Sequence, residues 1–227
     1  MAKKSRVLVV GDLHCPVMHK DYVPFLRDTY KRYRLDKVVM IGDIVDLHGM
    51  SYHESDPDLP SAAGELELAR RQVASVYKAF PKAEVMTGNH DALPERKARS
   101  AGIPAELIRQ PSQFLDVPGW RWHPRMETVI IDGVMYAHGD RGKQGDYAAM
   151  KNAICEGMNY VQGHLHSQAG VWYHACQSRL IFGMNVGCGV DRHSAAMKYG
   201  KGYSKKPIVG CGVVLSGVFP FYVPMEL

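Results

Sequence analysis

The sequence contains no long apolar run. None of its hydrophobic stretches approaches the ~20 residues that a helix needs to cross a bilayer. The basic N-terminus is followed by only a brief apolar stretch, which is too short for the core of a signal peptide. The sequence therefore predicts a cytoplasmic protein without a membrane segment.

Cysteine is scarce and irregularly placed. The five cysteines are an odd number, lie far apart and form no C-x-x-C pair. This pattern argues against a disulfide framework and against a zinc site built from thiolates. We expect reduced, mostly buried thiols. Cys15 alone lies beside a motif, where its thiolate would be an additional anionic ligand.

Acidic residues are absent between Arg192 and Met225, although the formal net charge is only +5. The lysines of the basic part of this segment are Lys198, Lys201, Lys205 and Lys206. A second basic cluster, which includes Arg96, lies at residues 95–99. These clusters form either two solvated faces or a field that attracts a polyanion or a phosphate ester. Arg96, the four lysines and the loop residue His193 are therefore the candidate substrate-binding residues.

The sequence also lacks internal repeats, low-complexity segments and linkers. Hydrophobic residues make up 46% and charged residues 22%, which is ordinary for a globular protein with a sizeable core. We therefore expect one domain over residues 1–227.

The first half of the chain alternates strand patterns with helical patterns. Apolar runs at residues 6–10, 37–41 and 84–87 predict strands, and a glycine follows each run. Apolar residues at helical spacing predict helices over residues 22–33 and 64–80. This order predicts parallel strands joined by crossover helices.

The second half looks more antiparallel. The Asp132-Gly133 turn between residues 128–131 and 134–137 is typical of a β-hairpin. Further strands are expected at residues 160–162, 171–174, 180–184, 208–215 and 218–223, and a helix at residues 146–155. The expected fold class is α/β with α+β character: a two-sheet mixed β-sandwich flanked by helices.

Two tryptophans stand out between the two halves. Trp120 and Trp122 follow Pro118 and Gly119, and this composition predicts a buried corner that packs against the sheet. The alternative is a platform on which nucleic-acid bases stack.

Side chains that bind metals follow five of the expected strands. They are Asp12 and His14, Asp43 and Asp46, Asn89, His90 and Asp91, His138 and Asp140, and His164 and His166. In open α/β sheets, ligands bind beyond the carboxyl ends of the strands. Each group alone is compatible with a turn or a helix cap, but five in succession predict one shared site. Burying these carboxylates and imidazoles together without a cation would be costly.

The types of donor indicate two divalent ions. Every donor is an oxygen or a nitrogen of Asp, Asn or His, which suits Mn²⁺, Fe²⁺, Zn²⁺, Co²⁺ or Ni²⁺, and we expect manganese first. Two carboxylates against two divalent ions leave a charge of about +2. Such a centre holds an anionic ester and lowers the pKa of coordinated water, so it predicts hydrolysis of phosphate esters.

The motifs GDLH, GDIVD, GNHD, HGD and GHLH resemble those of the calcineurin-like metallophosphoesterase superfamily, especially its compact bacterial and phage-type members. The resemblance covers residues 6–190 and implies the metallophosphoesterase fold with a dinuclear metal centre. The implied ligands of the first ion are Asp12, His14, Asp43 and His166. The implied ligands of the second ion are Asp43, Asn89, His138 and His164. The resemblance also implies that His90 is the general acid and that Asp91 orients its ring.

The predicted activity is hydrolysis of a phosphodiester in nucleic acid or in a nucleotide. A phosphomonoesterase or a nucleotide pyrophosphatase that acts on a small molecule is the alternative, because the same centre serves all three reactions. A non-catalytic scaffold on the same fold is a remote alternative, because such scaffolds are recognised by lost ligands and every ligand is present. The native substrate and the oligomeric state stay open.

Overall fold

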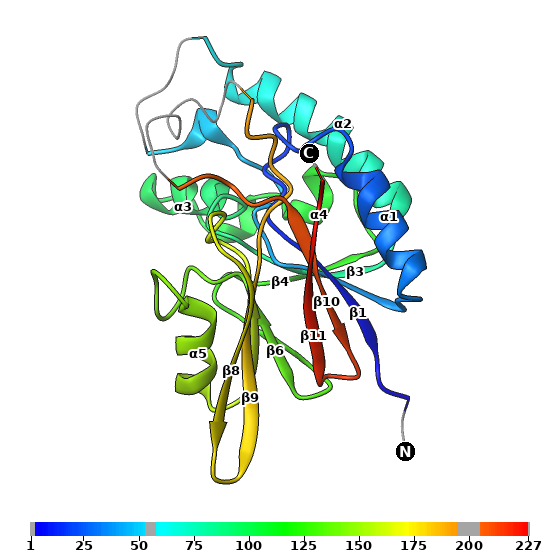
Figure 1. The fold of residues 1–227 in the computed structure, drawn as a ribbon. Helices are drawn as coiled ribbons and strands as arrows, with labels where there is room; N and C mark the ends of the chain where they lie inside the picture. The colour runs from blue at the N-terminus through cyan, green and yellow to red at the C-terminus, as the bar shows by residue number, and fades with distance from the viewer. Residues whose placement is uncertain (1–2, 53–57, 195–204, 227) are drawn as a thin grey trace.

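Two mixed sheets form the centre of the molecule in the computed structural model, which describes residues 3–52, 58–194 and 205–226 (Figure 1). The first sheet has the strand order β11 (Phe219–Pro224), β10 (Gly210–Leu215), β1 (Arg6–Val10), β2 (Lys37–Met40), β3 (Ala83–Met86) and β4 (Trp120–His123). The second sheet has the order β5 (Val129–Ile131), β6 (Val134–Ala137), β7 (Asn159–Gln162), β9 (Arg179–Val186) and β8 (Ala169–Cys176).

Helices cover the outer faces of this sandwich. The helices α1 (Tyr22–Arg32) and α2 (Ala62–Ala79) lie against the first sheet, and α5 (Ala148–Glu156) lies against the second (Figure 1). The remaining short helices are α3 (Leu93–Ser100), α4 (Pro111–Phe114), η1 (His48–Met50) and η2 (Ala105–Leu107). The predicted fold class, a two-sheet β-sandwich flanked by helices, is confirmed.

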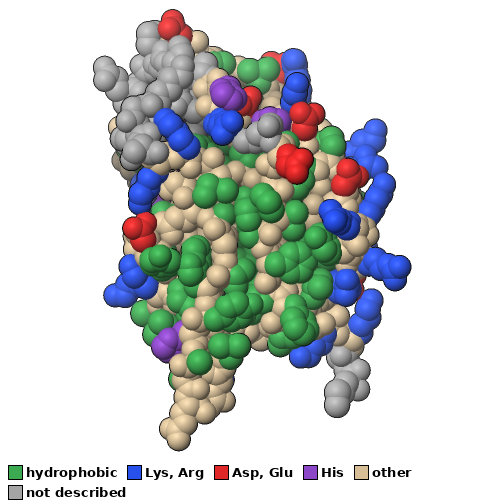
Figure 2. Space-filling model, viewed as in Figure 1, with side chains coloured by type: hydrophobic (Ala, Val, Ile, Leu, Met, Phe, Trp, Pro, Cys, Tyr) green, Lys and Arg blue, Asp and Glu red, His purple; other side chains and the backbone are tan. Residues whose placement is uncertain are grey.

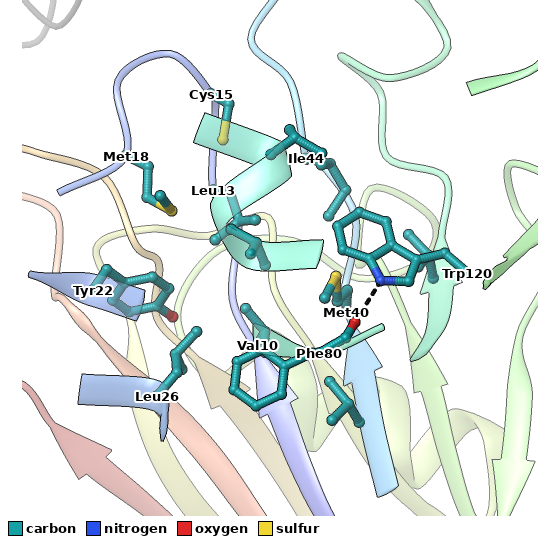
Figure 3. Close-up of a cluster of buried hydrophobic side chains, with 14 of the residues drawn as sticks. Val10, Leu13, Cys15, Met18, Tyr22, Leu26, Met40, Ile44, Phe80 and Trp120 are labelled. Atoms are coloured by element: carbon teal, nitrogen blue, oxygen red, sulfur yellow. Dashed lines mark hydrogen bonds between the residues drawn. The ribbon is translucent and has the colours of Figure 1, made fainter. Parts of the chain in front are cut away.

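The central strands are apolar throughout because both of their faces are buried. Side chains alternate across a strand, so Leu8 and Val10 of β1 pack toward α1 and α2, whereas Val9 packs between the two sheets. Figure 3 shows Val10 in the first of these layers, close to Tyr22 and Leu26 of α1. The uninterrupted apolar run at the start of the chain is therefore a strand buried on both faces.

The second half of the chain is less antiparallel than its sequence suggests. Strands β6 and β7 pair in parallel, and so do β7 and β9. Helix α5 connects β6 to β7 as a crossover, which makes their parallel pairing possible. Trp120 is buried, as the sequence predicts. However, Trp120 and Trp122 do not form a corner that packs against the sheet: they belong to β4, which pairs in parallel with β3 and extends the first sheet.

The face viewed in Figure 2 carries mainly hydrophobic side chains over β8 to β11, with Lys and Arg toward its margins. Tyr173, Leu180 and Phe219 are the most exposed large hydrophobic residues of these strands. No helix in the described ranges is long and apolar enough to span a bilayer.

The cysteines are divided between the core and the surface. Cys15, Cys188 and Cys211 are buried, whereas Cys155 and Cys176 are exposed. Burial raises the pKa of the Cys15 thiol, and its side chain lies in the hydrophobic core (Figure 3). The protonated, core-packed thiol does not suit the ligand role that its place in the sequence suggested.

The two tryptophans of β4 provide a matched pair of stability tests. The Trp120 indole N–H donates to the Phe80 carbonyl at 2.8 Å (Figure 3). The Trp122 indole N–H is buried without an acceptor among the described residues. Trp120→Phe leaves the Phe80 carbonyl unsatisfied, so it should lower the free energy of unfolding by about 1–3 kcal/mol more than Trp122→Phe. Urea denaturation measures both values. Equal losses would show that the hydrogen bond contributes nothing.

Candidate metal centre

Loops at the carboxyl ends of five strands converge on one cluster of Asp, Asn and His side chains. The cluster contains three groups of three residues, and within each group the candidate ligand atoms all lie within 4.8 Å of one another. These groups are Asp12, His14 and His166; Asp43, His138 and His164; and His14, Asp43 and His90. Asn89 Oδ1 adds a further donor, 3.0 Å from His138 Nε2. The structure therefore brings together all seven predicted ligands, which come from segments far apart in the sequence.

Asp43 lies at the centre of the cluster. Its Oδ2 atom is 3.6 Å from His14 Nε2 and 3.3 Å from His138 Nε2, and these two imidazoles belong to different groups. The Asp43 carboxylate is 2% exposed, so these imidazoles and not water surround it. A carboxylate in this position can contribute to both halves of a dinuclear site.

Three of the predicted ligands have a left-handed backbone. The φ angles are +47° at His14, +47° at Asp43 and +62° at His164. Residues other than glycine adopt this region rarely, and such strain concentrates at functional sites. Backbone hydrogen bonds hold the first two motifs together, since the amides of Leu13 and His14 both donate to the Asp43 carbonyl.

Two motif glycines make room for the carboxylates. A Cβ atom on Gly88 would lie 2.1 Å from Asp43 Oδ1, and one on Gly163 would lie 2.3 Å from Asp12 Oδ1. No side chain at either position fits without displacing a predicted ligand. This contact explains why GNHD and GHLH begin with glycine.

The hydrogen bonds of His138 leave a lone pair that faces oxygen. Its Nδ1 lies 3.0 Å from the Ile41 carbonyl, which only accepts, so Nδ1 carries the proton. Its Nε2 faces Asp43 Oδ2 at 3.3 Å and Asn89 Oδ1 at 3.0 Å. Burial lowers the pKa of His138, but the Asp43 carboxylate outweighs it and raises the pKa to about 10. Without a proton, His138 Nε2 would present a lone pair to two oxygen atoms that also carry lone pairs. Either a proton on Nε2 or a metal cation must therefore lie between Nε2 and these oxygens.

The other half of the cluster has the same need for a cation. His14 Nδ1 lies 2.7 Å from Asp46 Oδ1, while its Nε2 lies only 3.1 Å from His166 Nε2. Asp12 Oδ1 is buried and has no hydrogen-bond partner among the described residues. An orphaned carboxylate oxygen beside two facing imidazole nitrogens fits a divalent ion.

The charge of the cluster differs from the sequence-based value of about +2, which counted only Asp12 and Asp43. Asp46 and Asp91 are buried in the same cluster. Four carboxylates against two divalent ions sum to about zero, so neutral imidazoles would leave no residual positive charge. Burial and the neighbouring Asp43 raise the pKa of Asp91 to about 7, so the Asp91 carboxylate takes up a proton as the pH falls through about 7. Attraction of an anionic ester therefore depends on protonated groups and on nearby basic residues.

The ring of His90 is held by Asp46 and not by Asp91. His90 Nδ1 lies 2.6 Å from the Asp46 carbonyl and 3.3 Å from its Oδ1. Asp91 instead accepts backbone N–H bonds from Ile44, Val45 and Gly88 at 2.9–3.2 Å. The Asp91 carboxylate thus ties two motif loops together, and the contact with the His90 ring that was expected from Asp91 is made by Asp46, the second Asp of GDIVD.

The candidate substrate-binding residues are more scattered. Arg96 lies on α3, where its guanidinium carbon is 5.2 Å from the centre of the Tyr52 ring. His193 is exposed, and its backbone amide donates to Asp191. Lys205 pairs with Asp146 at 2.9 Å, and Lys206 is exposed. Lys198 and Lys201 lie outside the described residues. None of the four described residues belongs to the metal-ligand groups.

The family model for calcineurin-like phosphoesterases matches residues 5–168, which is most of the chain. The chain belongs to the calcineurin-like phosphoesterase family. This family is metal-dependent, and the Asp and His groups of this member fit bound metal. No curated protein sequence matches the chain.

Solved structures similar to this calcineurin-like phosphoesterase share little sequence with it. Vacuolar Protein Sorting 29 from Cryptosporidium parvum is 15% identical, with a TM-score of 0.46 over 92% of this chain and 85% of that chain. Yfce, a phosphoesterase from E. coli, is 13% identical, with a TM-score of 0.47 over 92% and 88% of the two chains. The nuclease MPE of Pseudomonas putida is 13% identical, with a TM-score of 0.30 over 96% and 87%. At these identities the likeness concerns the fold alone.

The different partners of Asp46 and Asp91 predict different effects of their amide variants. Asp46→Asn replaces the carboxylate that faces His14 Nδ1 and keeps the backbone carbonyl that faces His90, so it should lower metal affinity about 10- to 100-fold with little effect on stability. Asp91→Asn places an amide N–H₂ among three backbone donors, so it should lower the free energy of unfolding by about 1–3 kcal/mol. Calorimetric Mn²⁺ titration and urea denaturation separate the two effects. Loss of metal affinity in Asp91→Asn, or a larger loss of stability in Asp46→Asn, would contradict these assignments.

Proposed function

We propose that the protein is a metal-dependent phosphodiesterase that hydrolyses nucleic acid or a nucleotide at a dinuclear centre. The central position of Asp43 carries this proposal, because one carboxylate lies between the ligand groups of His14 and His138. Asp12, His14, Asp43 and His166 would hold one ion. Asp43, Asn89, His138 and His164 would hold the other, and manganese is the first candidate for both.

When bound, the two ions would polarise the phosphoryl oxygens and supply a nucleophile at neutral pH. The chain itself provides the geometry. The close Gly88 contact and the strained backbone at Asp43 leave its carboxylate little freedom to move, and the Gly163 contact does the same for Asp12. Buried imidazoles around it exclude bulk water from its oxygens. Preorganised ligands of this kind lose little free energy to rearrangement during the reaction.

His90 is the residue best placed to donate a proton to the leaving group. Its side chain is 28% exposed, compared with 4% for His14 and 3% for His138. Its Nδ1 donates to the Asp46 carbonyl, so Nε2 is free to carry the transferable proton. Burial lowers the pKa of His90, but Asp43 and Asp46 outweigh burial and raise the pKa above its usual range. These carboxylates therefore favour the protonated form of the ring, which a general acid needs.

The choice of a diester over a monoester rests on charge. Because Asp46 and Asp91 are buried beside Asp12 and Asp43, the centre has less surplus positive charge than two carboxylates alone would leave, and a diester carries one negative charge where a monoester dianion carries two. The basic segment at residues 198–206 supports a substrate with further phosphates, since it lacks any acidic residue. Its Lys205–Asp146 pair is exposed, so it can exchange for a phosphate at little cost.

The proposal predicts a substrate order. Protein reconstituted with Mn²⁺ should hydrolyse bis-p-nitrophenyl phosphate faster than p-nitrophenyl phosphate, and Asp43→Asn should hydrolyse neither. Asp140→Asn is the matched control, because it removes another buried carboxylate near the site, one that pairs with Arg125 and belongs to no ligand group. A preference for the monoester would favour the small-molecule phosphatase alternative. No turnover of either ester by the metal-loaded protein would favour the scaffold.

The general-acid role of His90 predicts a dependence on the leaving group. His90→Asn should slow hydrolysis of a dinucleotide, whose alkoxide leaves poorly, by about 10²- to 10⁴-fold. Hydrolysis of bis-p-nitrophenyl phosphate should slow much less, because nitrophenolate leaves without a proton. Metal content measured by elemental analysis should match that of the wild type. Equal losses for both esters, or loss of an ion, would make His90 a ligand instead.

A further inference from the structure

A pocket of about 220 Å³ lies directly beside the GNHD loop. Thr87 and Asp91 form the wall that the pocket shares with the motif. The opposite walls come from α3, from residues 105–111, from α4 and from β4 with the loop that follows it. The volume is below the ~300 Å³ at which pockets for drug-sized ligands begin. The pocket is therefore sized for one part of a ligand.

Thr87 and the ion pair of Arg125 form the wall between this pocket and the metal side of the loop. Thr87 also lines a smaller cavity that contains His138, a predicted ligand. The Arg125 guanidinium, on the pocket wall, donates to Asp140 Oδ2 at 2.6 and 3.0 Å, and Asp140 lies two residues after His138. The pocket thus adjoins the metal side of the loop, and the proposal below places one substituent of the substrate in it.

The pocket walls include aromatic rings and two guanidinium groups, those of Arg109 and Arg125. Trp122 and Phe114 supply aromatic rings, and Pro111 supplies an apolar ring surface. Arg109 is exposed and has no hydrogen bond or ion pair with any described residue. Of the two acidic residues that line the pocket, Glu95 pairs with Arg99 at 2.9 Å, and Asp91 accepts backbone N–H bonds. The pocket therefore combines planar faces with one uncommitted positive charge.

We propose that this pocket binds the base of a nucleotide unit attached to the scissile phosphate. The proposal rests on the phosphodiesterase function proposed above and specifies the substrate class of the same site. A base is planar and polarizable, so it stacks on aromatic rings and on guanidinium planes without requiring one particular sequence. Arg109 stacks on or pairs with the base, and Trp122 forms the aromatic wall. A simple alkyl or sugar substituent gains neither contact.

Two esters with the same leaving group test the proposal. Thymidine 5′-(p-nitrophenyl phosphate) and methyl p-nitrophenyl phosphate differ only in the nucleoside that the pocket would bind. Wild-type protein loaded with Mn²⁺ should show the higher kcat/KM for the thymidine ester. Arg109→Gln and Trp122→Leu should each lower that value about 5- to 150-fold, the range that follows from the loss of one stacking contact, and leave the methyl ester unchanged.

Arg121→Gln is the matched control for charge. Arg121 lies on β4 between Trp120 and Trp122, is 77% exposed and does not line the pocket. This variant should leave the kcat/KM of both esters unchanged. If the methyl ester is hydrolysed but Arg109→Gln and Trp122→Leu affect both esters alike, the base-binding inference fails while the phosphodiesterase function stands.

A binding measurement keeps the two proposals separable when neither ester is hydrolysed. Thymidine 5′-monophosphate should quench tryptophan fluorescence of the Mn²⁺-loaded protein, and ribose 5-phosphate should not. Arg109→Gln should weaken this quenching, and Arg121→Gln should not. Quenching without turnover would support the pocket and overturn the phosphodiesterase function. Equal responses to the two phosphates, or none, would overturn the pocket.

Discussion

The repulsion among four buried carboxyl groups is the constraint on which the site depends. Asp12, Asp43, Asp46 and Asp91 are each at most 8% exposed and lie in one cluster. Without a cation, imidazolium protons must balance them, and the raised pKa of His138 reflects this. Divalent ions would replace those protons, so metal binding is coupled to proton release and to the stability of the loops. Catalytic competence and local folding thus depend on the same cations.

The fold positions these groups by making several segments end at one edge. Strands β1, β2 and β3 run in parallel in one sheet, and β6 and β7 run in parallel in the other. Their carboxyl ends therefore present loops that meet between the sheets. Within the loops, backbone hydrogen bonds and close glycine contacts restrict where the ligand side chains can lie. The strands thus fix where the loops begin, and the loops carry the predicted ligands, three of which have a left-handed backbone.

Patterns local in the sequence predicted the strand ends and the ligand set, because an apolar run and the polar residues after it are read from neighbouring positions. Contacts between segments were not predictable in this way. Whether Asp46 or Asp91 faces His90 depends on packing between the second and third motifs, more than forty residues apart. Strand β4 was missed because its alternation of Trp with polar residues resembles a buried corner as closely as an edge strand.

The central claim is that two cations share Asp43. Anomalous scattering from crystals of the Mn²⁺-loaded protein tests it most directly. The account predicts two peaks, one among Asp12, His14 and His166 and one among Asn89, His138 and His164, with the Asp43 carboxylate between them. A single peak, or peaks away from Asp43 at full Mn²⁺ loading, would contradict the dinuclear centre.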